Sequence, residues 1–273
     1  MTVSFIHGIP SLASYRYRAE APAKWLEASI NDPSADVLVF VKPQECELEH
    51  AKRAIADGRR VVVDFQDNRF GRQPHLREFL RLASEITVPT EVTRQIVASM
   101  GRDSFVVQES YSYERAEPHC KGDRLFWFGN PVNLHTLQGV LPRIQDYPLT
   151  VLCGVPGTLP WSHENMLKGL ESDIVILPTT EYHRTANRAV EAIWRGCFVV
   201  AEPHSSLAGF PIWVGDMREG IEWAKANPAG ANEMTRAAQE YVAKHFAPEV
   251  IARQWHNAIN VGPMSRLGWR TAA

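Results

Sequence analysis

Short runs of β-branched and other apolar residues alternate with longer segments of helical periodicity along almost the whole chain. In the first part, these runs predict buried strands at residues 3–7, 36–41, 60–64, 85–88 and 104–108. Helices are expected between them, at residues 15–30, 45–56, 74–83 and 91–100. A repeated strand–helix–strand order predicts a parallel sheet with helices on both faces.

The pattern lapses in a polar stretch broken by Pro118 and Gly122, and then resumes. Further strands are expected at 125–128, 149–153, 173–177, 198–201 and 212–214, and helical pattern continues from 231 to 259 with a break at Pro248. A chain of 273 residues can bury two small cores. We therefore predict two Rossmann-like parallel-sheet α/β domains facing a cleft, where open sheets of this type bind ligands. The expected parts are 1–110, a linker at 111–123, 124–245, and a C-terminal helix at 246–273 that packs back on the first domain.

Composition narrows the classes of function. A formal net charge of −2 gives no global preference for nucleic acid or an anionic membrane. No apolar run approaches the roughly 20 residues needed to span a bilayer, and the first residues lack the pattern of a secretion signal. The four cysteines have no metal-binding spacing, so we expect no metal site and a reduced, cytoplasmic location.

The segment 172–203 contains the strongest chemical signal. A buried strand ending at Leu177 is followed by a polar loop, a helix that stops at Gly196, and another buried strand. Gly196 is typical of the left-handed residue just past a helix end. Donor side chains gather where the helix begins: His183, Arg184, Thr185, Asn187 and Arg188. With the free backbone N–H groups and the helix dipole, they would attract a phosphate.

Glu191 lies on the same helix face as Asn187 and Arg188, one turn further along. Its carboxylate is placed to accept hydrogen bonds from the two hydroxyls of a ribose. The segment thus predicts a nucleoside diphosphate site. The alternative is an ordinary solvated helix face, on which these charges form ion pairs with one another.

Gly129 and Asn130 follow the first strand of the second half. A glycine there lets the backbone approach a ligand closely. The alternative is a simple turn.

Acidic and basic residues of the first half suggest an acceptor site. Asp64 ends the third strand and Asp67 follows it, so either would act as a base or orient an acceptor hydroxyl. Four arginines are candidates for binding an anionic acceptor: Arg16, Arg18, Arg69 and Arg72. The alternatives are a helix cap or turn for each aspartate and a solvated surface for the arginines.

Segment 172–203 resembles the nucleotide-binding region of glycosyltransferases with the GT-B fold, especially the large retaining class. The residues from Arg184 to Arg188 (RTANR) are similar to a basic–Ser–x–Asn–Arg variant of that region. The resemblance implies that Arg184 and Thr185 meet the diphosphate, Glu191 the ribose, and Glu181 the donor sugar. It also implies that the loop of Gly129 and Asn130 borders the donor diphosphate. Glu181 and Glu191 are farther apart than the usual pair of glutamates in this class.

The resemblance implies a metal-independent glycosyltransferase without a resident cofactor, which retains anomeric configuration. Its co-substrate would be a UDP- or GDP-sugar. Several acceptor classes stay open: a glycan, a lipid-linked sugar, a small metabolite, or a hydroxymethylated DNA base of the phage type. The alternatives are a sugar-nucleotide epimerase of the same fold and a non-catalytic binding protein.

Overall fold

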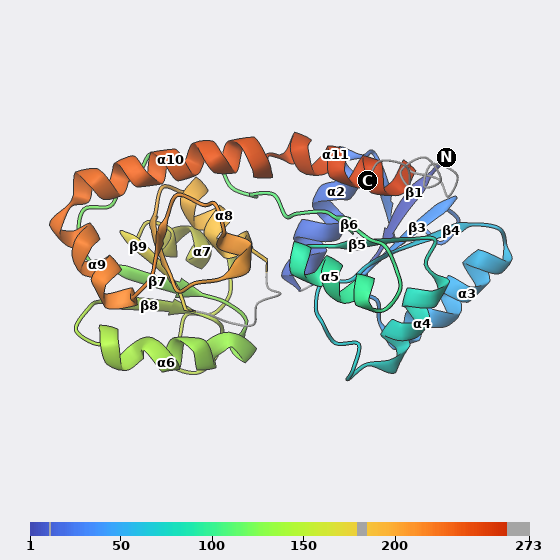
Figure 1. Ribbon diagram of the computed structural model, residues 1–273, viewed down its shortest axis with the longest axis horizontal. Helices are drawn as coiled ribbons and strands as arrows, with labels where there is room; N and C mark the ends of the chain where they lie inside the picture. The colour runs from blue at the N-terminus through green and yellow to red at the C-terminus, as the bar shows by residue number, and fades with distance from the viewer. Residues whose placement is uncertain (11, 179–184, 261–273) are drawn as a thin grey trace. The chain divides into compact units, whose positions relative to one another are not determined.

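The computed structural model describes residues 1–10, 12–178 and 185–260 (Figure 1). It divides into two compact units. Unit 1 contains Met1–Ser110 and the chain from Pro248, and unit 2 contains Tyr111–Ala247. Each unit has its own sheet, and the strand pairs of the described residues are all parallel. The predicted fold class, two parallel-sheet α/β domains, is confirmed.

The sheet of unit 1 has the strand order β2-β1-β3-β4-β5-β6. These strands are β1 (Val3–Ile6), β2 (Ser29–Ile30), β3 (Val37–Val41), β4 (Arg60–Asp64), β5 (Glu85–Val88) and β6 (Phe105–Val106). One face is covered by α3 (Leu48–Ala56), α4 (Pro74–Leu82) and α5 (Glu91–Ser99). The other is covered by α1 (Ala13–Tyr15), the π-helical turn η1 (Arg16–Glu20), α2 (Ala21–Trp25) and α11 (Pro248–Asn260).

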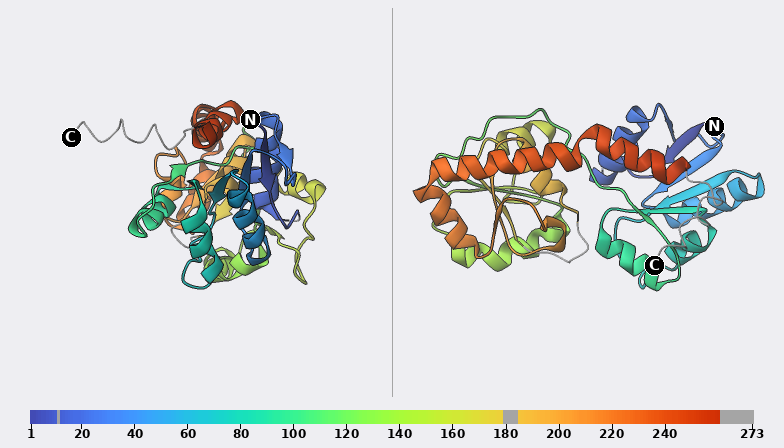
Figure 2. Two further views of the ribbon diagram at one scale, coloured as in Figure 1. Left: turned by 90° about the vertical axis from the view of Figure 1, so that its right-hand side faces the viewer. Right: turned by 45° about the horizontal axis from the view of Figure 1, so that its top comes forward.

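The sheet of unit 2 has the order β11-β10-β9-β7-β8. These strands are β7 (Leu125–Phe128), β8 (Leu149–Leu152), β9 (Ile174–Leu177), β10 (Phe198–Ala201) and β11 (Trp213–Val214). One face is covered by α7 (His163–Gly169), α8 (Asn187–Trp194) and α10 (Pro228–Phe246). The other is covered by α6 (Leu134–Ile144) and α9 (Met217–Ala226). The right-hand view of Figure 2, coloured as Figure 1, shows α10 and α6 on opposite sides of this sheet.

Helices on both faces explain why the strands are continuous apolar runs. All five residues of β3 are buried, as are all four of β7, β9 and β10. On α11, residues three to four positions apart face the sheet: Ile251, Trp255, Ala258 and Ile259. Trp255 packs edge-on against Phe5 of β1, with ring centroids 5.2 Å apart, so α11 completes the core of unit 1.

The helix predicted at residues 15–30 is wrong at its end. Helix α2 ends at Trp25, and Ser29–Ile30 instead forms the edge strand β2 beside β1. Glu27 has a φ of +52°, a left-handed conformation that stops the helix. The Ala28 N–H then donates to the Ala23 carbonyl at 2.8 Å, and the chain turns into the sheet. Other strands agree with the prediction to within one or two residues at either end.

The segment predicted as a linker, 111–123, lies inside unit 2 and contacts the C-terminal end of α8 and the side of α10. The Ala116 N–H donates to the Trp194 carbonyl at 3.1 Å, and the His119 N–H donates to the Gly196 carbonyl at 3.2 Å. Gly196 has a φ of +81°, which confirms the left-handed residue expected past the helix. A Cβ atom on Gly196 would lie 2.2 Å from the Glu117 carbonyl oxygen, so only glycine allows the segment to pass this closely.

We expect Gly196→Ala to destabilise unit 2 more than Gly157→Ala does. Gly157 has a similar φ of +83°, but its Cβ would meet nothing within 4 Å. Gly157→Ala should therefore cost about 1–2 kcal/mol from backbone strain alone. Gly196→Ala adds the steric clash, for a total of about 3 kcal/mol or more. Urea unfolding curves of both variants test this, and equal losses would contradict the close packing of Glu117 on Gly196.

Candidate functional site

The strand order of unit 2 places a topological switch point between β7 and β9. The chain goes from β7 to β8 on one side, and then crosses to β9 on the other side of β7. Open parallel sheets bind ligands outside the carboxyl ends of the strands at such a point. Gly129 and Asn130 follow β7 here, and Pro178 follows β9. Helix α8, which comes after β9, begins at Asn187.

Arg188 and Gly129 meet at this switch point. An Arg188 Nη1–H donates to the carbonyl oxygen of Phe128, the last residue of β7, at 3.2 Å. The guanidinium lies 6.0 Å from the centroid of the Trp127 ring. A Cβ on Gly129 would be 3.1 Å from that ring and 3.6 Å from Arg188 Nη1. The structure therefore brings together two residues predicted to bind the donor, and the absence of a side chain at Gly129 leaves room for the Trp127 ring and for Arg188.

Asn130 forms a turn. Its side-chain oxygen accepts from the Val132 N–H at 3.1 Å and caps the 3₁₀ turn η3 (Pro131–Asn133). The Asn133 N–H also donates to the Asn130 carbonyl, at 2.8 Å. Contact of Asn130 with a donor stays a prediction.

Glu191 lies on α8 one turn beyond Arg188 and is fully buried. Its two carboxylate oxygens share the Ser112 N–H, at 3.1 and 3.2 Å. This contact ties residues that follow unit 1 in sequence to α8, and sequence reasoning missed it because Ser112 has no pattern of its own. Thr185 and Asn187 are half-buried beside the start of α8. The predictions for Glu181, His183 and Arg184 lie outside the described residues.

In unit 1, Arg18 and Asp64 form a buried ion pair. Both side chains have an exposed fraction of 0%, and the guanidinium donates through both Nε, at 3.1 Å, and Nη2. Asp64 also accepts from the hydroxyl of Thr87 at 2.7 Å and from the side-chain amide of Gln66 at 2.8 Å. Arg18 lies over the Trp255 ring of α11, 4.9 Å from its centroid. These contacts join η1, β4, β5 and α11, and give both residues a structural role inside the unit.

Asp67 is the more accessible of the two predicted acidic residues. Its side chain is 14% exposed and lies 3.2 Å from Lys42 Nζ and 3.5 Å from an Arg69 nitrogen. Lys42 directly follows β3 and has a φ of +51°. Strained residues of this kind tend to occur at functional sites. Sequence analysis did not select Lys42, although a lysine directly after a buried strand was visible.

The switch point of unit 1, between β1 and β3, contains His7 and Glu47. His7 Nδ1 accepts from the Ile9 N–H at 3.0 Å, and Nε2 lies 3.1 Å from the Ser14 hydroxyl. Burial, and then the charge of Lys42, lowers the pKa of His7 against the opposing effect of Asp64. Burial raises the pKa of Glu47, although the Gln44 N–H donates to its carboxylate.

The remaining candidate arginines differ in their surroundings. Arg16 is half-buried, hydrogen-bonds to the Tyr17 hydroxyl and lies over the Tyr17 ring, 4.4 Å from its centroid. The Arg69 side chain is 43% exposed and reaches Asp67. Arg72 is exposed, two residues before α4.

We also searched the described residues for clusters of metal-binding side chains and for helices that could span a membrane. Among residues 1–10, 12–178 and 185–260, no three His, Cys, Asp or Glu side chains come close enough to hold a metal ion. Within the same ranges, no helix combines the length and apolar character that crossing a bilayer requires.

Comparisons of the whole chain identify its fold. No family model and no curated protein sequence matches it. Anabaena HepE in complex with UDP-glucose superposes with a TM-score of 0.70 at 13% identity, over 94% of this chain and 98% of HepE. A variant of S. aureus TarM in complex with fondaparinux, alpha-GlcNAc-glycerol and UDP gives a TM-score of 0.65 at 13% identity, over 82% of this chain and 55% of TarM. A putative UDP-N-acetylglucosamine 2-epimerase from Listeria monocytogenes gives a TM-score of 0.55 at 10% identity, over 94% of this chain and 95% of the epimerase. The chain has the GT-B fold that its sequence resembles.

We expect Asp64→Asn to destabilise the protein by about 3–5 kcal/mol, because Arg18 would keep a buried charge without its partner. The matched control is Lys52→Gln, which breaks an exposed pair with Glu49 on the surface of the same unit and should leave stability unchanged. Thermal and urea unfolding measure both variants. A stable Asp64→Asn protein would contradict the structural role of this pair.

Proposed function

We propose that the protein is a glycosyltransferase, which moves a sugar from a nucleoside diphosphate sugar to an acceptor hydroxyl. The observation that supports this most is the meeting of Arg188 and Gly129 at the switch point of unit 2. This site occurs in a fold shared with proteins whose structures contain UDP-glucose or UDP. Those ligands favour UDP over GDP as the donor nucleotide.

The chemistry expected of this site is stabilisation of the leaving group. When the bond from the anomeric carbon to the diphosphate breaks, negative charge develops on the phosphate oxygens. Arg188 and the positive end of the α8 dipole would stabilise that charge through groups already in place. A metal ion is not needed for this role, and we propose that Thr185, Asn187 and Arg188 supply the donors. Asn130, His183 and Arg184 belong to the same proposed set.

Glu191 is proposed to bind the ribose, one helical turn from Arg188. Because Glu191 is fully buried and accepts from the Ser112 N–H, ribose binding requires the chain around Ser112 to shift. We propose that Glu181 lies near the donor sugar. We also propose that the transferred sugar keeps its anomeric configuration.

On unit 1, we propose Asp67 rather than Asp64 as the residue that orients or deprotonates the acceptor hydroxyl. Asp64 is committed to Arg18, whereas Asp67 keeps an exposed fraction and lies between two cations. Arg16, Arg69 and Arg72 would bind an anionic acceptor. A lipid-linked sugar, a glycan and a hydroxymethylated DNA base are the candidates, and the net charge of −2 makes DNA the least favoured of them.

The epimerase is the less favoured alternative. The Listeria structure superposes with a TM-score of 0.55, against 0.70 for HepE. An epimerase would convert its sugar nucleotide without any acceptor, so analysis of the products separates the two activities.

A panel of UDP- and GDP-sugars, each with and without an acceptor mixture, tests the proposed reaction directly. We expect one UDP-sugar to release UDP faster when an acceptor is present, with the sugar recovered on the acceptor. Interconversion of sugar nucleotides without acceptor would favour the epimerase. Failure of every donor to bind in a thermal-shift assay would contradict both enzymes and favour a non-catalytic protein.

We expect Arg188→Gln to weaken UDP binding about tenfold or more, because a charge-assisted hydrogen bond to phosphate contributes roughly 1.5–3 kcal/mol. Arg236→Gln is the matched control, since Arg236 is an exposed arginine of α10 in the same unit. Calorimetric titration with UDP measures both affinities, and circular dichroism checks that the variants fold. Equal affinity in the two variants would remove Arg188 from the donor site.

A further inference from the structure

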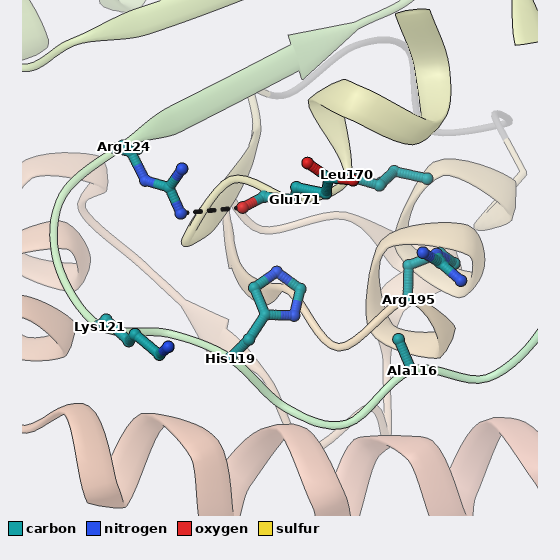
Figure 3. A pocket seen from close by; sticks show the side chains of 7 residues that line it. All are labelled: Ala116, His119, Lys121, Arg124, Leu170, Glu171 and Arg195. Atoms are coloured by element: carbon teal, nitrogen blue, oxygen red, sulfur yellow. Dashed lines mark hydrogen bonds between the residues drawn. The ribbon is translucent and has the colours of Figure 1, made fainter. Parts of the chain in front are cut away.

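A hollow lies at the opposite end of the strands from the proposed donor site, beside the amino ends of β7, β9 and β10. It has a volume of about 400 Å³ and is lined by Ala116, His119, Lys121, Arg124, Leu170, Glu171 and Arg195. Figure 3 shows the His119 ring in its middle, with Arg124 on one side and Arg195 on the other. All of these residues belong to unit 2. The strands between the two edges are four residues long, so roughly 13 Å of sheet separates this hollow from Gly129.

The lining is mainly cationic. Arg124 is paired with Asp173, whose oxygen lies 2.8 Å from the Arg124 Nε. Among the residues that the structure describes, no carboxylate lies within ion-pair distance of Lys121 or Arg195. The Nε of Arg195 is buried and has no hydrogen-bond partner within those residues. Glu171 is the one carboxylate that lines the hollow, so the described side chains leave an excess of positive charge.

Nearby acidic groups cancel only part of this charge. Burial raises the pKa of the Cys120 thiol to about 11, and burial also raises that of Cys197, so both thiols stay neutral near pH 7. Asp173 is buried; burial by itself would raise its pKa, but hydrogen bonds from Arg124 and from the Lys121 N–H lower it overall. Asp173 is therefore ionised, and its charge is matched by Arg124.

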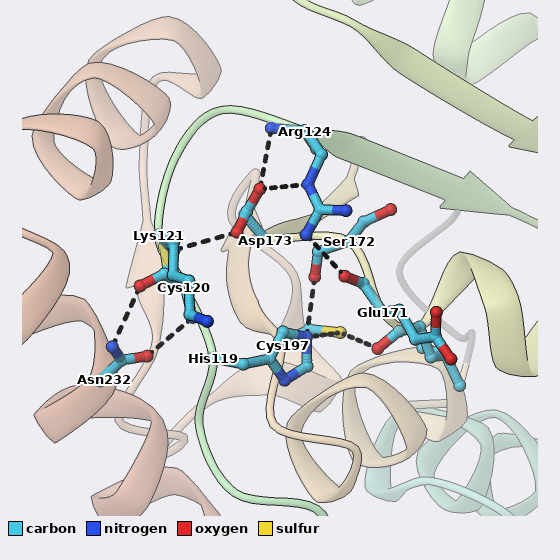
Figure 4. A network of polar contacts seen from close by, with 10 residues as sticks. His119, Cys120, Lys121, Arg124, Glu171, Ser172, Asp173, Cys197 and Asn232 are labelled. Atoms are coloured by element: carbon cyan, nitrogen blue, oxygen red, sulfur yellow. Dashed lines mark hydrogen bonds and ion pairs between the residues drawn. The ribbon is translucent and has the colours of Figure 1, made fainter.

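The wall formed by residues 116–124 is fixed on several sides (Figure 4). Asn232 of α10 holds Cys120 by two hydrogen bonds, accepting from its N–H at 2.8 Å and donating to its carbonyl at 3.0 Å. Asp173 accepts from the Lys121 N–H at 2.9 Å. Because these hydrogen bonds already hold the backbone in place, binding of a ligand would not carry the conformational-entropy cost of ordering this segment.

Some of the cationic side chains that line the hollow donate hydrogen bonds to backbone carbonyl oxygens, but these bonds do not occupy all of their N–H groups. Arg124 donates to the Glu171 carbonyl at 2.9 Å, and both ring nitrogens of His119 face carbonyl oxygens, of Glu117 at 3.2 Å and Ser172 at 3.0 Å. Arg195 donates to the Glu114 carbonyl through Nη1, which leaves its buried Nε unexplained. The Lys121 ammonium has no such carbonyl among the described residues. An anion would satisfy both groups.

We propose that this hollow binds a small phosphate-bearing anion, held by Lys121, Arg195 and Arg124. The volume fits a small molecule, and guanidinium and ammonium groups are the usual partners of phosphate in proteins. The C-terminal end of α8 at Arg195 disfavours an anion through its dipole, which is why several cations are needed there. The site is independent of the proposed donor site at the other edge of the sheet.

Calorimetric titration of the full chain with inorganic phosphate, against chloride at equal ionic strength, tests this site. The wild-type protein should bind phosphate, and Lys121→Gln should weaken that binding about tenfold or more. Lys244→Gln is the matched control, because Lys244 is an exposed lysine of α10 outside the hollow. A parallel titration with glycerol 3-phosphate distinguishes free phosphate from a phosphate monoester, and binding of either supports the site.

A second pair of variants separates this hollow from the donor edge. Arg195→Gln should also lose phosphate binding, whereas Arg188→Gln should keep it; Lys121→Gln should bind UDP as the wild type does. Absence of phosphate binding by the wild-type protein would overturn the proposal. Equal effects of Lys121→Gln and Lys244→Gln would do the same, as would loss of phosphate binding in Arg188→Gln alone.

Discussion

The strand order of unit 2 is the constraint on which the account depends. Because β7 lies between β8 and β9, the helix that follows β7 (α6) and the helix that follows β9 (α8) cover opposite faces of the sheet. Ligands of open parallel sheets bind at the carboxyl ends of two such strands. Arg188 reaches across from α8 to the end of β7, and Gly129 leaves room there for Arg188 and the Trp127 ring. The same order occurs in unit 1, where β1 lies between β2 and β3. His7 directly follows β1, and Lys42 directly follows β3. Chemistry-bearing side chains therefore gather at corresponding places of two separate sheets.

The sheets were predictable because their strands are covered on both faces. A strand such as β3 has to be apolar at every position, and that pattern is visible without any partner. Helix α8 and Gly196 were predictable for a similar reason, since helix ends have local signals. The edge strand β2 was not predicted, because a strand of two residues is too short to show an alternating or continuous apolar pattern. The turn before it depends on the left-handed backbone conformation of Glu27, which a glutamate in the sequence does not indicate.

The candidate site was less predictable, because its residues are defined by partners far away in sequence. Arg18 was visible as a charged residue at a helix start and Asp64 as one at a strand end. The sequence did not show that the two side chains pair in the core. The position of Glu191 one turn after Arg188 follows from helix periodicity, whereas its contact with Ser112 depends on how residues 111–123 cross unit 2. Lys121, Arg124 and Arg195 are spread over 75 residues of chain, so no local motif marks the hollow that they line. Burial and pairing decide which charged residues are available to a ligand.

A crystal structure of the protein with UDP tests the central claim most directly. We expect the diphosphate at the carboxyl ends of β7 and β9, within hydrogen-bond distance of Arg188 and beside Gly129, with the ribose toward Glu191. A diphosphate bound at the other edge of the sheet, against Lys121 and Arg195, or at unit 1 alone, would contradict the assignment of the donor site.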